Sequence, residues 1–221
     1  MDFWSTGLGY AGTVLQIVLL WLIFRGPLKR YFPLFLYVLS SVVVNSAQGY
    51  VFQKWGADRE HYYPIYWGGT LFLDIQFFLL MITLTPRALE GNPSRSRLVR
   101  IMGVVAVVVL LIPFVAFESR LFTTRWNDST SQLLNFGAAV MNLVLWGALL
   151  IGKQRDRQLL TVSAGLGVAV AGAALTHGLR SFTGEDTVGR EIADYLYRLL
   201  YIGSVAIWCW AFRPARKPVP V

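Results

Sequence analysis

Four charged residues are candidates for function because they lie within apolar stretches of the chain, where an ion needs a chemical reason to be present: Asp74, Arg198, Asp194 and Glu191. Asp74 lies about eleven residues into one stretch, roughly 16 Å deep at 1.5 Å per helical residue. Arg198 lies about 10 Å into another by the same rise, and Asp194, four residues earlier, shares its helix face. Because an isolated ion at such depth costs several kcal/mol, we predict that Asp74 meets Arg198 and that Asp194 shares the guanidinium. Such a cluster would bind a polar ligand, relay a proton, or only neutralise itself and fix helix register.

Amide side chains form a second polar set within the apolar stretches. Asn45 and Gln48 lie close together in the second stretch. The remaining amides of this kind are Gln76, Asn135 and Asn142. Amides in such helices usually bond to a neighbouring helix. Four of these polar residues would nevertheless lie in the middle or outer half of the bundle, which is consistent with a ligand-binding cavity that opens outward. They are Asn45, Gln48, Asp74 and Arg198.

Metal and catalytic chemistry have weaker support. His61 and His177 are both expected near the outer face, where Glu191 or Asp194 would complete a metal or haem site, but their spacing does not require one. Glu191 and Asp194 are the one candidate carboxylate pair, and a three-residue step is equally natural at a solvated helix start. We therefore expect no catalytic residue, no metal and no cofactor.

The composition is typical of a protein that lies in a lipid bilayer. Of the 221 residues, 55% are hydrophobic and 14% are charged, whereas soluble domains carry about 25% charged residues. A net charge of +8 is also found in proteins that bind nucleic acid. We expect no nucleic-acid partner, because the basic residues follow the loops and do not form one patch.

Seven stretches are long enough to cross a bilayer core, which takes about 20 helical residues. They cover residues 7–24, 32–52, 63–85, 99–117, 132–152, 159–182 and 191–212. Short turn-forming or charged segments, such as 126–129, connect them. The predicted fold is an all-α bundle of seven transmembrane helices, forming one domain over residues 1–213 with a short tail at 214–221. Gly165, Ala169 and Ala173 repeat every four residues, which favours close helix packing.

Lys and Arg residues in the connections indicate the orientation. Thirteen lie on the side of the first, third and fifth loops and the C-terminal tail, against six on the other side. The basic side of a membrane protein is cytoplasmic. We therefore predict a multi-pass protein of the cell inner (plasma) membrane, with its N-terminus outside and its C-terminus in the cytoplasm. Trp and Tyr residues gather near both predicted interfaces, as anchoring side chains do.

Three known seven-span families share this size and topology. Microbial rhodopsins need a lysine in the last span, and residues 191–212 contain none. Alkaline-ceramidase-like hydrolases need three histidines within the bundle, and the chain has two in all. Sugar carriers of the SWEET type have two parallel three-helix repeats joined by a single helix. The prolines that those carriers use within their spans are missing here, apart from Pro33 at a helix start.

The segments 31–37, 66–67 and 197–208 resemble those of small uncharacterised seven-transmembrane proteins of bacterial genomes. They contain Tyr31-Phe-Pro-Leu-Phe-Leu-Tyr37, Tyr66-Trp67 and Tyr197-Arg198-Leu-Leu-Tyr201, the last followed by Trp208. The resemblance implies the topology and no activity.

The main functional hypothesis is a non-enzymatic membrane protein, a receptor-like or accessory module that binds a small ligand or a partner protein within or beside the bundle. The alternative is a small-solute transporter with a 3+1+3 helix plan. A membrane enzyme acting on lipid or isoprenoid is a third hypothesis, for which Glu191 and Asp194 are the sole candidate carboxylate pair.

Overall fold

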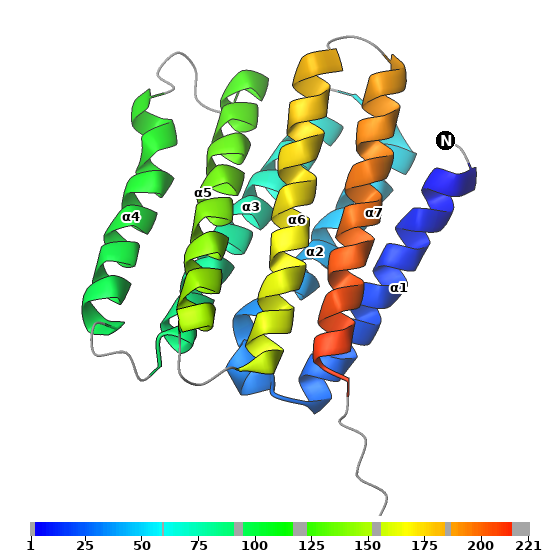
Figure 1. The fold of residues 1–221 in the computed structure, drawn as a ribbon. Coiled ribbons are helices and arrows are strands. Elements are labelled where there is room, and N and C mark those ends of the chain that lie inside the picture. The colour runs from blue at the N-terminus through cyan, green and yellow to red at the C-terminus, as the bar shows by residue number, and fades with distance from the viewer. Residues whose placement is uncertain are drawn as a thin grey trace, which may run out of the picture.

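The computed structural model is a bundle of α-helices that lie side by side (Figure 1). It describes residues 3–58, 60–90, 95–116, 123–151, 156–183 and 187–213, and over these ranges it contains seven helices and no strand. They are α1 (Phe3–Arg25), α2 (Leu28–Trp55), α3 (Tyr62–Ala88), α4 (Arg95–Ala116), α5 (Thr124–Ile151), α6 (Arg157–Thr183) and α7 (Thr187–Ala211). We call the end where α1 begins the upper end of the bundle, and the end where α7 terminates the lower end.

Each of the seven predicted spans coincides with one of these helices, but α5 begins earlier than expected. The segment Trp126–Ser129, predicted as a connection, lies within the first turns of α5. Thr123 precedes the helix, and its hydroxyl accepts the backbone N–H of Trp126 at 3.3 Å, as a capping side chain does. The Trp126 indole donates to the carbonyl of Pro113 at 3.0 Å, which ties the start of α5 to the end of α4.

The start of α2 contains a kink. Tyr31 has φ −115° and ψ 27°, outside the helical region, two residues before Pro33. Proline lacks a backbone N–H, and its ring disfavours helical geometry in the preceding residue. The regular part of α2 therefore begins close to the predicted residue 32.

Six helices form a closed ring, and α4 lies outside it. The ring order is α1, α2, α3, α5, α6 and α7, with α7 packed against α1, while α4 packs on α3 and α5 (Figure 1). In this order α1, α2 and α3 follow one another on one side of the ring, and α5, α6 and α7 follow one another on the other side.

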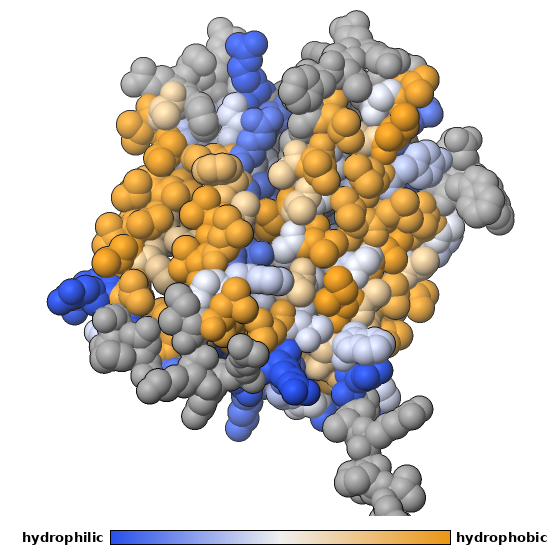
Figure 2. All heavy atoms as spheres, in the orientation of Figure 1, coloured by the Kyte–Doolittle hydropathy of each residue, from blue (hydrophilic) through white to orange (hydrophobic). Residues whose placement is uncertain are grey.

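Six of the described helices, α1 to α6, are long and apolar enough to cross a bilayer. The seventh, α7, has similar length and lies beside them (Figure 1), but Glu191, Asp194 and Arg198 make its upper half polar. Apolar side chains cover much of the outer surface in Figure 2. On α4 alone, Val104, Val107, Leu111, Phe114 and Val115 are exposed. Such a surface is stable in hydrocarbon, not in water.

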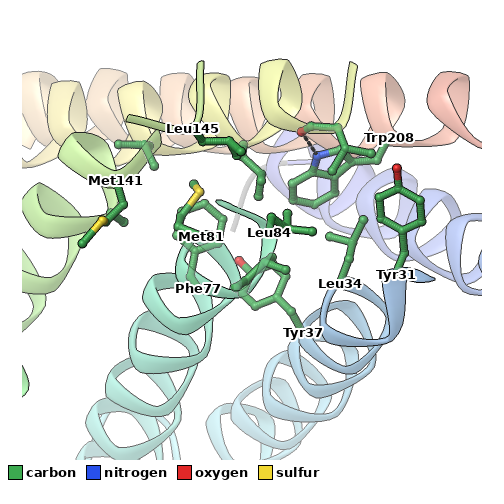
Figure 3. Close-up of a cluster of buried hydrophobic side chains, with 14 of the residues drawn as sticks. Tyr31, Leu34, Tyr37, Phe77, Met81, Leu84, Met141, Leu145 and Trp208 are labelled. Atoms are coloured by element: carbon green, nitrogen blue, oxygen red, sulfur yellow. Dashed lines mark hydrogen bonds between the residues drawn. The ribbon is translucent and has the colours of Figure 1, made fainter. Parts of the chain in front are cut away.

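The apolar core lies mostly in the lower half of the bundle. Figure 3 shows side chains from α2, α3, α5 and α7 converging there. Tyr37 packs on Phe77 with ring centroids 5.2 Å apart and meets Trp208 edge-on at 6.3 Å. Tyr31 meets Phe212 edge-on at 4.9 Å. Aromatic pairs in such arrangements contribute about 0.5–1.5 kcal/mol beyond their burial.

Trp208 joins α7 to α6 at the centre of this core. Its side chain is fully buried, and its indole donates to the carbonyl of Val162 at 3.0 Å (Figure 3). A Cβ on Gly165 would lie 2.6 Å from Cδ1 of Trp208 and 3.0 Å from the carbonyl oxygen of Ser204. Only glycine therefore leaves room for this indole. The predicted close packing of the sixth span is confirmed at Gly165.

We expect Gly165→Ala to destabilise the protein. Overpacking a well-filled core costs about 1–3 kcal/mol, more than the roughly 1 kcal/mol that alanine gains over glycine in a helix. Gly147→Ala on α5 is the matched control, because a Cβ there meets no atom within 4 Å. Thermal unfolding in detergent should show a lower midpoint for Gly165→Ala and an unchanged or higher one for Gly147→Ala. Equal midpoints would contradict the packing described for Trp208.

Candidate functional site

Buried hydroxyls in the lower half of the bundle bond within their own helices. Thr85, Ser163 and Ser204 donate to carbonyl oxygens at 2.9, 3.0 and 2.7 Å. In the middle of the bundle, by contrast, polar side chains of different helices bond to one another. These clusters form the candidate site.

Asp74 is held by donors from α5. The Ser131 hydroxyl donates to Oδ2 of Asp74, and the Asn135 amide donates to Oδ1 at 3.3 Å. Asn135 also donates to the backbone oxygen of Ser131 at 2.9 Å, which orients its amide. Neutral donors thus stabilise a carboxylate at mid-height between α3 and α5. This arrangement can bind a proton, a cation or a hydrogen-bond donor of a ligand.

The predicted pairing of Asp74 with Arg198 stays a prediction. The hydrogen bonds of Asp74 lead to α5, whereas Arg198 lies half-buried on α7, which packs against α6 and α1. Asp194 is half-buried one turn above Arg198, and Glu191 is exposed nearer the upper end. The three lie along one helix, as their spacing requires.

A second polar cluster connects α1, α2 and α7. The Gln16 amide donates to Ser41 Oγ at 3.0 Å and also to the Tyr201 hydroxyl. Ser41 Oγ and the Tyr201 hydroxyl lie 2.9 Å apart, and the predicted site residue Asn45 donates to Ser41 Oγ at 3.2 Å. Of these residues, only Asn45 was predicted. A glutamine within an apolar helix is the one signal by which Gln16 could have been found.

Tyr37 lies below the two clusters. Its side chain is 8% exposed and packs on Phe77 of α3. On α2 it lies four residues below Ser41, and Phe77 lies three residues below Asp74 on α3. The Tyr37–Phe77 contact therefore lies about one helical turn below both clusters.

Gln48 has a structural role at the α2–α3 contact. Its amide donates to the backbone oxygen of Tyr66 at 3.2 Å. A Cβ on Gly69 would lie 3.0 Å from Nε2 of Gln48 and 2.6 Å from Cγ1 of Val44. Gly69 thus permits the close approach of the helices, and Gln48 bonds across it, as amides in spans usually do.

His61 contacts residues of its own loop and of the end of α2 at the upper end of the bundle. Its backbone N–H donates to Oδ1 of Asp58 at 2.7 Å, its ring Nδ1 lies 2.9 Å from Oδ2, and the ring stacks on Trp55 at 5.0 Å. The backbone and side-chain hydrogen bonds from His61 lower the pKa of Asp58 below its usual range. The side chain of His177 lies outside the described residues, so the weak metal set of His61, His177 and Glu191 stays untested.

Besides Arg87 at the lower end, several buried polar atoms on α3 and α5 lack a hydrogen-bond partner within the part of the chain that the structure describes. They are Trp67 Nε1, Gln76 Oε1, Thr130 Oγ1 and Asn142 Oδ1. An unsatisfied buried polar group costs about 1–3 kcal/mol, so such atoms normally meet water or a ligand. Trp67 and Thr130 lie above the height of Asp74, and Gln76 lies two residues below it on α3.

Comparisons with protein-family models, curated proteins and solved structures find no match to this chain.

We expect Ser131→Ala to lower stability by about 1–3 kcal/mol, because the buried Asp74 carboxylate loses a hydroxyl donor. In an Asp74→Ala background the same substitution should cost much less, since the carboxylate it serves is absent. Ser129→Ala, in the same part of α5, is the control and should have a small effect in both backgrounds. Chemical unfolding of the four proteins of the cycle measures the coupling. Additive effects would contradict the Asp74–Ser131 contact.

Proposed function

We propose that this chain is a seven-span protein of the cell inner membrane, with its N-terminus outside and its C-terminus in the cytoplasm. Within the bundle it binds a small polar ligand or a segment of a partner protein, as a receptor-like or accessory module without catalysis of its own. One observation carries the proposal. The buried apolar core lies mostly in the lower half of the bundle, whereas buried hydrogen bonds between polar side chains of different helices gather in its middle, around Gln16 and Asp74.

The distribution of polar groups supports binding from the upper side. Figure 2 shows hydrophilic atoms between apolar flanks in the upper half of the face turned to the viewer. Ligand sites generally combine an apolar lining with a few convergent polar groups. The two clusters, which contain Asp74 and Tyr201, supply both donors and acceptors. A polar ligand that reaches this height would also satisfy buried atoms of Trp67, Gln76 and Thr130 that no side chain satisfies.

The charge distribution supports the proposed orientation. Among the described residues, the lower end carries many basic side chains, namely Arg25, Lys29, Arg30, Arg87, Arg95, Arg97, Arg100, Arg157 and Arg213. Two of them stack on tryptophan rings, Arg25 on Trp21 at 4.3 Å and Arg213 on Trp210 at 3.7 Å. An excess of Lys and Arg is typical of the cytoplasmic side, and tryptophans are typical of either interface.

A small-solute transporter is the second candidate, and the helix order favours it. The ring divides into α1–α2–α3 and α5–α6–α7, with α4 outside it, and a 3+1+3 plan requires two three-helix units and a separate helix. A carrier must also expose its site to the lower side. The packed core around Trp208 and Tyr31 would then have to open.

We expect labelling of single cysteines to report the orientation. In a Cys209→Ala background, Ala57→Cys lies in the upper α2–α3 connection and Glu90→Cys at the lower end of α3. A membrane-impermeant maleimide should label Ala57→Cys in intact cells and Glu90→Cys only after permeabilisation. The reverse pattern would contradict an outside N-terminus.

Two further cysteines separate the candidate functions. Asn135→Cys, half-buried beside Asp74, should react with a small impermeant thiol reagent from the outside only. Ser204→Cys, fully buried in the lower half, should react from neither side. A receptor-like module predicts this pattern with or without added solutes. Reaction of Ser204→Cys from the cytoplasmic side when a solute is supplied outside would favour the carrier, and an unreactive Asn135→Cys would contradict a site open to the upper side.

A further inference from the structure

Two donor groups at the lower end of the bundle are buried without an acceptor. Tyr31 on α2 is fully buried, and its hydroxyl has no hydrogen-bond partner among the described residues. The same holds for Nη1 of Arg87 on α3. The Arg87 Cζ lies 5.9 Å from the Tyr31 ring centroid, so the two groups belong to one cluster.

Arg30 brings a second guanidinium to the same ring. Its Cζ lies 5.8 Å from the centroid of Tyr31. Asp156, which precedes α6, pairs with Arg30 and also accepts the backbone N–H of Leu159 at 3.1 Å. The Asp156 carboxylate is thus already bound by Arg30 and by the start of α6.

Other arginines at this end have a different environment. Arg25 and Arg213 stack on exposed tryptophans, where water can reach their nitrogens. A guanidinium has five N–H donors and no acceptor. Burying an N–H donor of a charged group without an acceptor costs more free energy than burying a donor of a neutral group. Arg87 and Tyr31 therefore require an acceptor from outside the described chain.

We propose that Arg87, Tyr31 and Arg30 form a binding site for a phosphate group at the lower end of the bundle, the headgroup of an anionic phospholipid being one source and free phosphate the other. A phosphate carries several acceptor oxygens and two guanidinium groups match its charge and geometry. The cluster lies where the helices end, at the height of lipid headgroups. Basic pockets between helices on the cytoplasmic side bind such headgroups.

The site rests on the proposed membrane placement of the bundle and is independent of ligand binding near Asp74. Its failure would therefore leave the upper polar region untouched. Conversely, an unreactive Asn135→Cys would not affect the phosphate site.

The test measures binding to the purified full-length protein in a neutral detergent. Native mass spectrometry and thermal-shift measurements are made with phosphatidylglycerol, with phosphatidylcholine and with inorganic phosphate. We expect phosphatidylglycerol to raise the unfolding midpoint and to remain bound in the mass spectrum. A shift with phosphatidylglycerol alone identifies the lipid headgroup as the source, and an equal shift with inorganic phosphate identifies the free anion.

Four variants assign the effect to this cluster. Arg87→Gln should weaken binding about tenfold to 100-fold, as loss of a charge-assisted hydrogen bond does. Tyr31→Phe removes only the hydroxyl and should weaken it about two- to tenfold. Asp156→Asn keeps a capping side chain but removes the competing charge, so binding should tighten. Arg100→Gln on α4 removes a charge from the same end and should leave binding unchanged.

Two results would overturn the proposal. One is the absence of any shift with both lipids and with phosphate, which would mean that water satisfies the cluster. The other is a shift that Tyr31→Phe, Arg87→Gln and Arg100→Gln all retain equally, which would indicate unspecific attraction to basic residues. Because Tyr31→Phe changes a single oxygen, it keeps the test decisive even if Arg87→Gln fails to fold.

Discussion

The contact between Trp208 and Gly165 is the constraint on which the lower half of the bundle depends. The indole fills the space that a side chain on α6 would take, and it meets Tyr37 of α2 edge-on. Tyr37 in turn packs on Phe77 of α3. One buried side chain thus couples α6, α7, α2 and α3 across the ring. Since protein interiors are close-packed, these helices cannot shift independently at this height.

This rigid lower half holds the polar groups above it in fixed positions. Gln16, Ser41 and Tyr201 come from three helices, and their hydrogen bonds form only if the helices keep their relative rotation. Asp74 and Ser131 depend in the same way on the α3–α5 contact. An arrangement of this kind is preorganised, so that a ligand does not have to order the side chains it meets.

The helices could be predicted from the sequence, but most of their contacts could not. Long apolar stretches located all seven helices, because a span must satisfy its own backbone hydrogen bonds. The predicted start of α5 was wrong, because Asn127 and Asp128 are typical of turns. In the structure, the Thr123 cap and the hydrogen bond from Trp126 to Pro113 extend the helix through them. Asp74 was found because a charge in an apolar stretch is conspicuous. Its partners depend on helix rotation, and Ser131, Ser41 and Tyr201 look ordinary in a sequence.

The two ends of the bundle solve the problem of polar groups in an apolar surrounding differently. In the middle of the bundle, the uncharged side chains of Ser131 and Asn135 donate to the Asp74 carboxylate, and the unpaired atoms on α3 and α5 above the lower end are themselves neutral. At the lower end, the unpaired groups are the donors of Arg87 and Tyr31, beside a single carboxylate that Arg30 already binds. Neutral unpaired groups are satisfied by water, or by a polar ligand that donates or accepts the hydrogen bond. The charged donors of Arg87 call for an anion, and this difference between the two ends is the basis of the proposed phosphate site.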